Sequence, residues 1–183
     1  MISKKLLIMK KITAHLEGIV PTWADLPPEM VDTPCPYDLS KSVYRGRVVF
    51  GEEVKPPFIA ILEAPRQINP NGGGDSRLLQ DEDWTLLIQG FAIDDKKHPT
   101  DPAYDLLAWV QMRMARITAE RKSGGRGGQY PQEWRLGGLV APIRYQIPIV
   151  RPGQDDVSGS AYFYMPISVG TVTDLTMPFA QED

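Results

Sequence analysis

The amino-acid sequence predicts one α+β domain, residues 1–183, with two main helices packed on a mostly antiparallel sheet of about five strands. Two segments carry apolar residues at intervals of three and four, which is the spacing of an amphipathic helix. Five other segments alternate apolar and polar residues or are apolar throughout, as strands do. Because 17 prolines and 16 glycines occur among 183 residues, we also expect long Pro/Gly-rich loops between these elements.

The first predicted helix covers residues 4–17, where Leu6, Met9, Ile12 and Leu16 share one face. Gly18 follows, and glycine commonly ends helices. Residues 20–41 contain five prolines and four acids. We expect them to form an extended connection without regular structure.

The next predicted elements are strands over residues 43–50 and 58–63, and the short stretch 51–55 between them is interpreted as a hairpin connection. Residues 66–83 include the sequence NPNGGGDSR and are expected to form a flexible loop. The strand over residues 84–93 is apolar on both faces. A strand of this kind normally lies at the centre of a sheet that is covered on both sides.

The second helix is predicted from the Asp101–Pro102 pair to Ile117. An aspartate can accept hydrogen bonds from the free N–H groups of a first helical turn, and a proline there has no N–H to leave unpaired. Leu106, Val110 and Met114 repeat at helical intervals, so one face of this helix should pack against the sheet.

The C-terminal third contains two further predicted strands, residues 143–150 and 161–169, joined by a hairpin loop. Pro148 and Pro166 have no N–H donor and should lie at a sheet edge or at a bulge. Residues 123–135, which are rich in glycine, are expected to form a second flexible loop. Residues 171–183 are expected to form a loosely held tail.

The charges form blocks although the net charge is only −3. Residues 1–11 hold four lysines and no acid, residues 81–105 hold seven acids, residues 113–151 hold eight basic residues, and no lysine or arginine follows residue 151. The blocks fit either solvated faces or a subunit whose acidic and basic sides meet in neighbouring copies, as in a head-to-tail ring. Strong nucleic-acid binding fits poorly, because it needs an excess of positive charge.

No segment predicts catalysis, a cofactor or a metal centre. Gly72 to Gly74 are followed by Asp75, where a phosphate-binding loop needs lysine and a hydroxyl residue. His98 lies near three aspartates, but one histidine in a polar turn is typical of a solvated turn. Cys35 is the only cysteine, so no internal disulfide exists. No apolar run approaches a membrane span, and Lys10 and Lys11 interrupt the only stretch that resembles a signal peptide.

The candidate contact residues lie around the two ends of the second helix. Trp109 falls off the main apolar stripe, so either residues 20–41 cover it or it anchors a contact between subunits. The other candidates are charged side chains that could meet a neighbouring copy or partner: Arg113, Arg116, Arg121, Lys122, Arg126, Asp94 and Asp95.

Residues 83–117 resemble the equivalent region of tail terminator proteins, also called tail completion proteins, of long-tailed bacteriophages. The matching features are the strand WTLLIQGFAID, the turn DDKKHPTDP and the helix AYDLLAWVQMRMARI. The helix-first order and the last long strand, YFYMPISV, agree with that family. The resemblance covers most of the chain as a pattern of elements.

This resemblance implies a structural virion protein without enzymatic activity. Such proteins form a homo-hexameric ring that caps the tail tube, ends its growth and provides the head-joining surface. The implied partners are further copies of the chain, the tail tube protein and a head-completion protein of the neck, with DNA only passing through the ring. The implied location is the tail or neck of the virion, which is assembled in the host cytoplasm.

Two departures from the family pattern leave the partner surfaces open: the proline-rich segment 20–41 and the glycine-rich stretch 69–74. The alternatives are another neck or tail component, such as a head-closure protein or a sheath terminator, and a small metal-dependent enzyme that uses His98.

Overall fold

The computed structural model describes residues 1–23, 26–30, 32–64, 78–93, 95–121, 127–153 and 160–180. Within them the chain is an α+β protein with a mostly antiparallel sheet, as the sequence predicts. The main sheet has the strand order β2–β3–β4–β7–β5, and β6 also pairs with β7. The strands are β2 (Val43–Arg45), β3 (Phe58–Glu63), β4 (Leu79–Phe91), β5 (Ile143–Tyr145), β6 (Ile149–Arg151) and β7 (Tyr162–Asp174).

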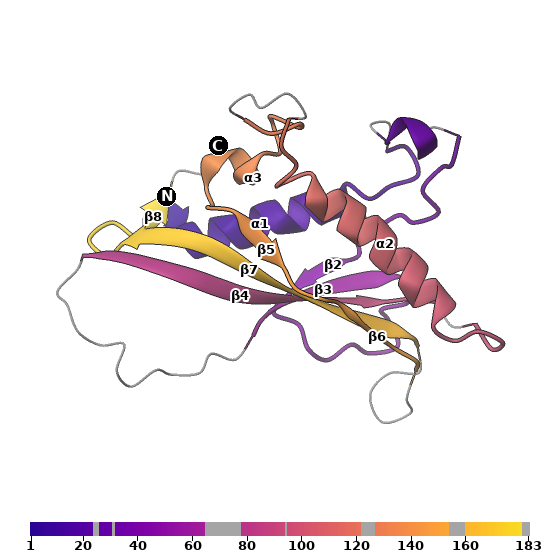
Figure 1. The fold of residues 1–183 in the computed structure, drawn as a ribbon. Helices are drawn as coiled ribbons and strands as arrows, with labels where there is room; N and C mark the ends of the chain where they lie inside the picture. The colour runs from indigo at the N-terminus through magenta and orange to yellow at the C-terminus, as the bar shows by residue number, and fades with distance from the viewer. Residues whose placement is uncertain are drawn as a thin grey trace.

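Helices α1 (Lys4–Glu17) and α2 (Asp101–Ala115) lie on the same face of this sheet, which we call the inner face (Figure 1). Their apolar stripes pack against the strand residues that point inward, and these side chains form the main core. It includes Ile8, Ile12 and Leu16 of α1, Leu106, Val110 and Met114 of α2, and Ile59, Trp84, Ile88, Phe163 and Ile167 of the sheet. α1 has its predicted bounds, and α2 ends two residues before Ile117.

The outer face of the sheet carries a second, aromatic cluster. Phe58, Phe91 and Tyr162 are buried there, and Phe50 packs on them from the segment between β2 and β3. The described residues therefore cover one end of the outer face with a loop, whereas the inner face carries both long helices.

The central position predicted for β4 is confirmed, but Ile93, predicted on a buried face, is 61% exposed.

The predicted hairpin over residues 51–55 is wrong, because β2 and β3 run parallel. Parallel neighbours need a crossover of about a dozen residues, which a short turn cannot provide. The strand predicted over residues 43–50 ends at Arg45, and Gly46 then takes a positive φ of 65° that turns the chain away. The connection brings Phe50 and Val54 onto the aromatic cluster before β3 begins.

The strand predicted over residues 143–150 is divided into β5 and β6 by one extra residue. Tyr145 pairs with Ile167 and Ile149 with Tyr164, so the three residues 146–148 face the two residues 165–166. This arrangement is a bulge. Pro148 lies within the bulge, and Pro166 lies opposite it on β7. Gln146 donates its N–H to the Pro166 carbonyl at 3.0 Å. The predicted preference of both prolines for an edge or a bulge is therefore confirmed.

Three segments predicted as loosely held contain regular structure. β4 begins at Leu79, inside the predicted loop 66–83, and residues 65–77 lie outside the described residues. β7 continues to Asp174, and β8 (Phe179–Ala180) pairs with β1 (Ile2–Ser3), so the tail 171–180 is structured. In the predicted loop 123–135, residues 127–135 are described, and Gln129 and Arg135 donate backbone hydrogen bonds to Ala119 and Ile117.

Two short helical turns complete the fold. η1 (Pro28–Met30) is the one helical turn described within the otherwise irregular connection 20–41. α3 (Arg135–Gly138) is a left-handed turn, with φ of 49° at Arg135, 54° at Leu136, 76° at Gly137 and 84° at Gly138.

Replacing Gly90 by alanine should destabilise the protein. Gly90 of β4 faces Phe163 of β7, and an added Cβ would overlap the phenyl ring. Overpacking of this kind costs roughly 1–3 kcal/mol of unfolding free energy, measurable by chemical denaturation. Phe163→Leu in the same background should recover part of the loss, because the smaller side chain leaves room. Additive losses in the double variant would contradict the proposed overlap.

Candidate subunit interface

The C-terminal half of α2 holds three of the predicted contact residues, and the chain itself covers them. Trp109 is 5% exposed, and its ring centroid lies 6.0 Å from that of Trp23. Of the two interpretations of Trp109, the structure supports cover by residues 20–41. The guanidinium groups of Arg113 and Arg116 lie 5.1 and 5.6 Å from the Trp23 ring. These side chains stabilise the monomer and form no exposed contact surface.

Glu133 supplies the negative charge that makes this burial possible. Its Oε2 lies 2.9 Å from Nε of Arg116, whose side chain is only 6% exposed, and its Oε1 lies 3.5 Å from Nη1 of Arg113. Arg116 also lies over the ring of Tyr130, 3.9 Å from its centroid. A buried guanidinium without a counter-charge is strongly destabilising. Glu133 therefore allows the basic end of α2 to lie inside the protein.

His15 joins the C-terminal ends of α1 and α2 through two reciprocal bonds. Its Nε2 lies 2.7 Å from the Arg113 carbonyl oxygen, and Nε of Arg113 donates to the His15 carbonyl at 2.8 Å. Because a carbonyl only accepts, Nε2 carries a proton and donates it to the Arg113 carbonyl. Burial, and then the charges of Arg113 and Arg116, lower the pKa of His15 to about 3.

The remaining predicted contact residues are dispersed. Arg121 is exposed and donates from Nε to the Gly128 carbonyl at 3.3 Å. Asp95 is also exposed, and its Oδ1 accepts the backbone N–H groups of His98 and Lys97 at 2.9 and 2.7 Å, which lowers the Asp95 pKa. This pattern is a side-chain-capped turn. Asp94, Lys122 and Arg126 lie outside the described residues.

The residue types that commonly bind metals or act as nucleophiles are dispersed among the described residues. Among them, no group of three or more His, Cys, Asp or Glu side chains could hold a metal ion. Cys35 is buried, its Sγ lies 3.6 Å from the Tyr37 carbonyl, and burial raises the pKa of the thiol, so this thiol is poorly suited to act as a nucleophile. No helix in this part of the chain is long and apolar enough to span a bilayer.

The two long strands continue into a two-stranded extension that we call the ribbon end, residues 79–83 of β4 and 170–174 of β7. β4 and β7 pair along all 13 residues of each strand, whereas β3 pairs only with residues 86–91 and β5 reaches only Val169. Exposed apolar side chains gather at the ribbon end and the turn beyond it: Leu78, Leu79, Val172, Leu175, Met177 and Phe179.

Along the ribbon end, one backbone edge of β4 lies beyond the part of β4 that pairs with β3. Ala64 donates its N–H to the Thr85 carbonyl, and Ala161 accepts from the Ala92 N–H. Residues two apart on a strand direct their backbone groups to the same side. The backbone N–H and C=O groups of Thr85 and of the odd-numbered residues before it therefore point towards the β3 side. Among the described residues, no strand pairs with residues 79, 81 and 83 on that side, which we call the β4 edge.

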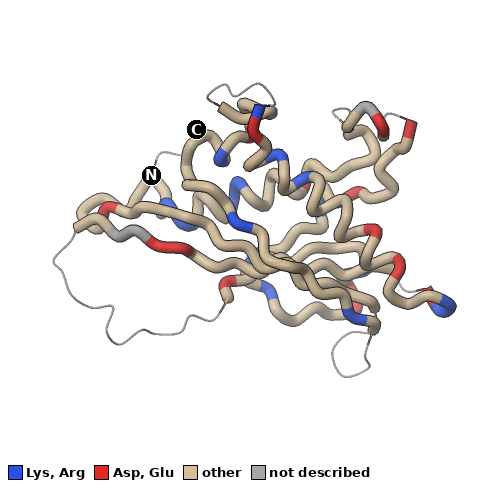
Figure 2. The backbone as a smooth tube through the Cα atoms, viewed as in Figure 1, with Lys and Arg blue, Asp and Glu red and all other residues tan. Residues whose placement is uncertain are grey.

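The opposite side of the sheet ends at β5 and β6, which both pair with β7 alone in the described residues. We call this border, residues 143–151, the β5–β6 edge. Ile147 in its bulge is 88% exposed, and Ile149 is also exposed. Acidic residues lie along the ribbon end of β4 and basic residues along β5 and β6 (Figure 2). The two edges lie on opposite sides of one sheet, and Arg144 of the β5–β6 edge is paired across β7 with Asp83 of β4, at 2.7 Å within the subunit.

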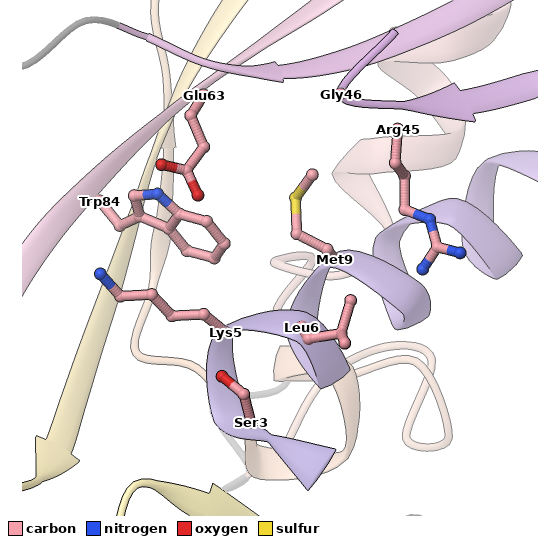
Figure 3. A pocket seen from close by; sticks show the side chains of 8 residues that line it. All are labelled: Ser3, Lys5, Leu6, Met9, Arg45, Gly46, Glu63 and Trp84. Atoms are coloured by element: carbon pink, nitrogen blue, oxygen red, sulfur yellow. The ribbon is translucent and has the colours of Figure 1, made fainter.

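A cavity of about 640 Å³ lies on the inner face beside the β4 edge, where β2 and β3 end. Figure 3 shows the ring of Trp84 and the side chains of Leu6 and Met9 around it, with charged side chains at its rim. Nζ of Lys5 is already paired with Glu82 at 2.5 Å and lies 5.4 Å from the Trp84 ring centroid. The lining is Ser3, Lys5, Leu6, Met9, Arg45, Gly46, Glu63 and Trp84.

Sequence reasoning missed the ribbon end because acids and a glycine-rich stretch precede Trp84. The available signal was the continuation of β7, where Thr171, Val172 and Thr173 are β-branched residues that favour strands. Comparison with known proteins adds nothing to this geometry, since no protein-family model and no curated protein sequence matches the chain.

Removing the negative charge of Glu133 should destabilise the monomer. Glu133→Gln removes the carboxylate charge that lies 2.9 Å from the buried guanidinium of Arg116. Because Glu133 is partly exposed, we expect a loss of roughly 2–4 kcal/mol of unfolding free energy rather than the full cost of a broken buried pair. Glu120→Gln, at an exposed position, is the matched control and should change little. Equal stability of the two variants would contradict the role given to Glu133.

Protonation of His15 should make the fold sensitive to mild acid. The unfolded chain binds a proton near the ordinary pKa of 6.5, whereas the folded chain resists protonation until about 3, so stability is complete above 6.5 and falls as the pH drops. We expect a loss of about 2 kcal/mol of unfolding free energy on going from about pH 7.5 to about pH 5.

His15→Gln keeps a donor for the Arg113 carbonyl and should remove most of this pH dependence in denaturation experiments. His98→Gln, at an exposed histidine, should retain it. A His15→Gln protein with the wild-type pH dependence would show that His15 is not its source.

Proposed function

We propose that this chain is a structural subunit of a long-tailed bacteriophage, a tail terminator that forms a ring on the tail tube, ends tube growth and provides the head-joining surface. The subunits are identical copies, and the partners are the tail tube protein and a head-completion protein of the neck. DNA passes through the ring without being bound as a substrate.

The observation that carries this proposal is a pair of sheet edges on opposite sides of one subunit that no strand of the described residues pairs with. Open edges present unpaired N–H and C=O groups, and soluble monomers normally cover or shorten them. Here both edges carry exposed apolar residues, Leu79 on one side and Ile147 on the other. A contact between two different surfaces is heterologous, and it closes into a ring when the rotation between copies permits.

Two further observations agree with a structural role. The described residues hold no cluster suited to a metal ion, and the turn around His98 is capped by Asp95 and is exposed. The resemblance of residues 83–117 to tail terminators lies in β4, the following turn and α2, which form one continuous unit of this fold. This unit positions the sheet from which both edges arise.

The proposal predicts ring-shaped oligomers or capping of tube ends. Mass photometry of the purified protein should show a species of several subunits, and electron microscopy should show rings at the ends of tail tubes assembled in vitro. Tubes grown with the protein should stop at shorter lengths than tubes grown without it. His98→Ala should leave both results unchanged. Bare tube ends and unrestricted growth would overturn the proposal.

A further inference from the structure

We infer that the cavity between α1 and the ends of β2 and β3 binds a short apolar peptide whose two ends are free. The ammonium end lies at Glu63 and the carboxylate end at Arg45, with the apolar side chains of the peptide between them. This inference goes beyond the proposed function, because it concerns a further binding site of the single subunit and does not depend on ring formation.

The strand register places an acid, a base and an indole around this cavity. Arg45 of β2 pairs with Ile61 of β3, which is buried in the main core, and Glu63 lies two residues further along β3. Residues two apart on a strand share a face, so both charged residues lie on the inner face of the sheet. Glu63 pairs with Leu86, and Trp84 lies two residues from Leu86 on the same face of β4. The three side chains therefore border one space of about 640 Å³.

The indole nitrogen of Trp84 is a buried donor beside this space. Trp84 is 1% exposed, and its Nε1 has no hydrogen-bond partner among the described residues. Buried polar groups are normally paired with protein, water or a bound molecule, because otherwise they lose their bonds to water without replacement. Figure 3 shows this nitrogen on the ring edge that faces the Glu63 side chain. A peptide carbonyl that enters the cavity next to Glu63 supplies an acceptor for it.

Arg45 and Glu63 provide opposite charges on two sides of the cavity. Neither is paired with a charged group of the described residues, whereas Lys5, the other charged residue of the lining, is paired with Glu82. In Figure 3, Glu63 and Arg45 lie on opposite sides of Met9, so the two charges are held apart. A peptide with free ends offers an ammonium group for Glu63 and a carboxylate for Arg45, and both contacts are charge-assisted.

The wall between these charges is apolar. Leu6 and Met9 of α1 line the cavity on one side and the ring of Trp84 on another, and Leu6 is 46% exposed (Figure 3). Covering such surface favours binding, so the side chains of the peptide should be apolar. The cavity volume lies within the range of about 300–1,000 Å³ that is typical of small-ligand sites. A dipeptide such as Leu-Leu meets both requirements.

Titration with Leu-Leu tests the inference. The indole N–H signal of Trp84 in a proton–nitrogen correlation spectrum, identified by its loss in Trp84→Phe, should shift and saturate, and calorimetry should give the affinity. Trp84→Phe keeps an aromatic ring and should weaken binding about fivefold, the effect of one hydrogen bond. Leu-Leu that is acetylated at its N-terminus or amidated at its C-terminus should bind about threefold more weakly, because exposed charge pairs contribute modestly.

Two variants identify which charge holds which end. Glu63→Gln should make acetylated and free Leu-Leu bind equally, and Arg45→Gln should do the same for amidated and free Leu-Leu. Each variant thus removes the preference for one end alone. Glu52→Gln and Lys55→Gln are the matched controls, because both residues are exposed and lie outside the cavity lining. Unchanged thermal unfolding shows that each variant still folds.

The outcomes are distinct from those that test the ring. Absence of saturable binding of Leu-Leu at millimolar concentration overturns the inference, and so does equal binding of the free and blocked peptides. Tighter binding of Leu-Leu blocked at both ends also overturns it, and indicates an internal segment of a partner protein as the occupant. The titration can be read whether or not the chain caps tail tubes, so either proposal can fail without the other.

Discussion

The structure depends on the uninterrupted pairing of β4 with β7. These strands share a register over 13 residues and are the longest elements of the main sheet. β3, β5 and β6 each pair directly with one of them, and β2 is placed through β3. Trp84, Ile88, Phe163 and Ile167 project from this pair into the main core. The two helices pack on the surface that these side chains create. Because both strands continue past their shorter neighbours, the same pairing also generates the ribbon end.

The second constraint is electrostatic and acts within the subunit. A helix that ends in arginines normally directs them into water, where they complement the negative end of the helix dipole. Here Arg113 and Arg116 are enclosed by Glu133, Trp23 and the carbonyl of His15. The basic charge that the sequence places at the end of α2 is thus largely satisfied inside the monomer. Charges at the ribbon end are also paired within the subunit, Lys5 with Glu82 and Arg144 with Asp83.

Local sequence patterns were sufficient to predict the elements that have one apolar stripe. α1 and β3 have the predicted bounds, and the helix around Leu106 and Val110 was placed nearly correctly, because helical and strand periodicity depend only on nearby residues. The parallel pairing of β2 with β3 was not predictable in this way, since the direction of pairing is decided by contacts such as those of Phe50 with the aromatic cluster.

Local sequence patterns were also insufficient to predict the environment of the candidate contact residues. Charge and position identified Arg113 and Arg116 as contact residues, but their burial depends on Glu133, which lies about twenty residues further along the chain and gives no local signal. The spacing of apolar residues also could not reveal the two sheet edges, because an edge is defined by the absence of a neighbouring strand. Only the register of β3, β4 and β7 reveals that residues 79, 81 and 83 have no strand partner on one side within the described residues.

The account's central claim is that the sheet edges of this subunit become covered when copies assemble into a ring. Residue-resolved hydrogen exchange, measured on the dilute subunit and on the assembled protein, tests it most directly. The account predicts that the amides of residues 79, 81 and 83 exchange at least about tenfold more slowly after assembly, while those of residues 80 and 82, already bonded to β7, change little. Equal exchange of residues 79, 81 and 83 in the two states would contradict it.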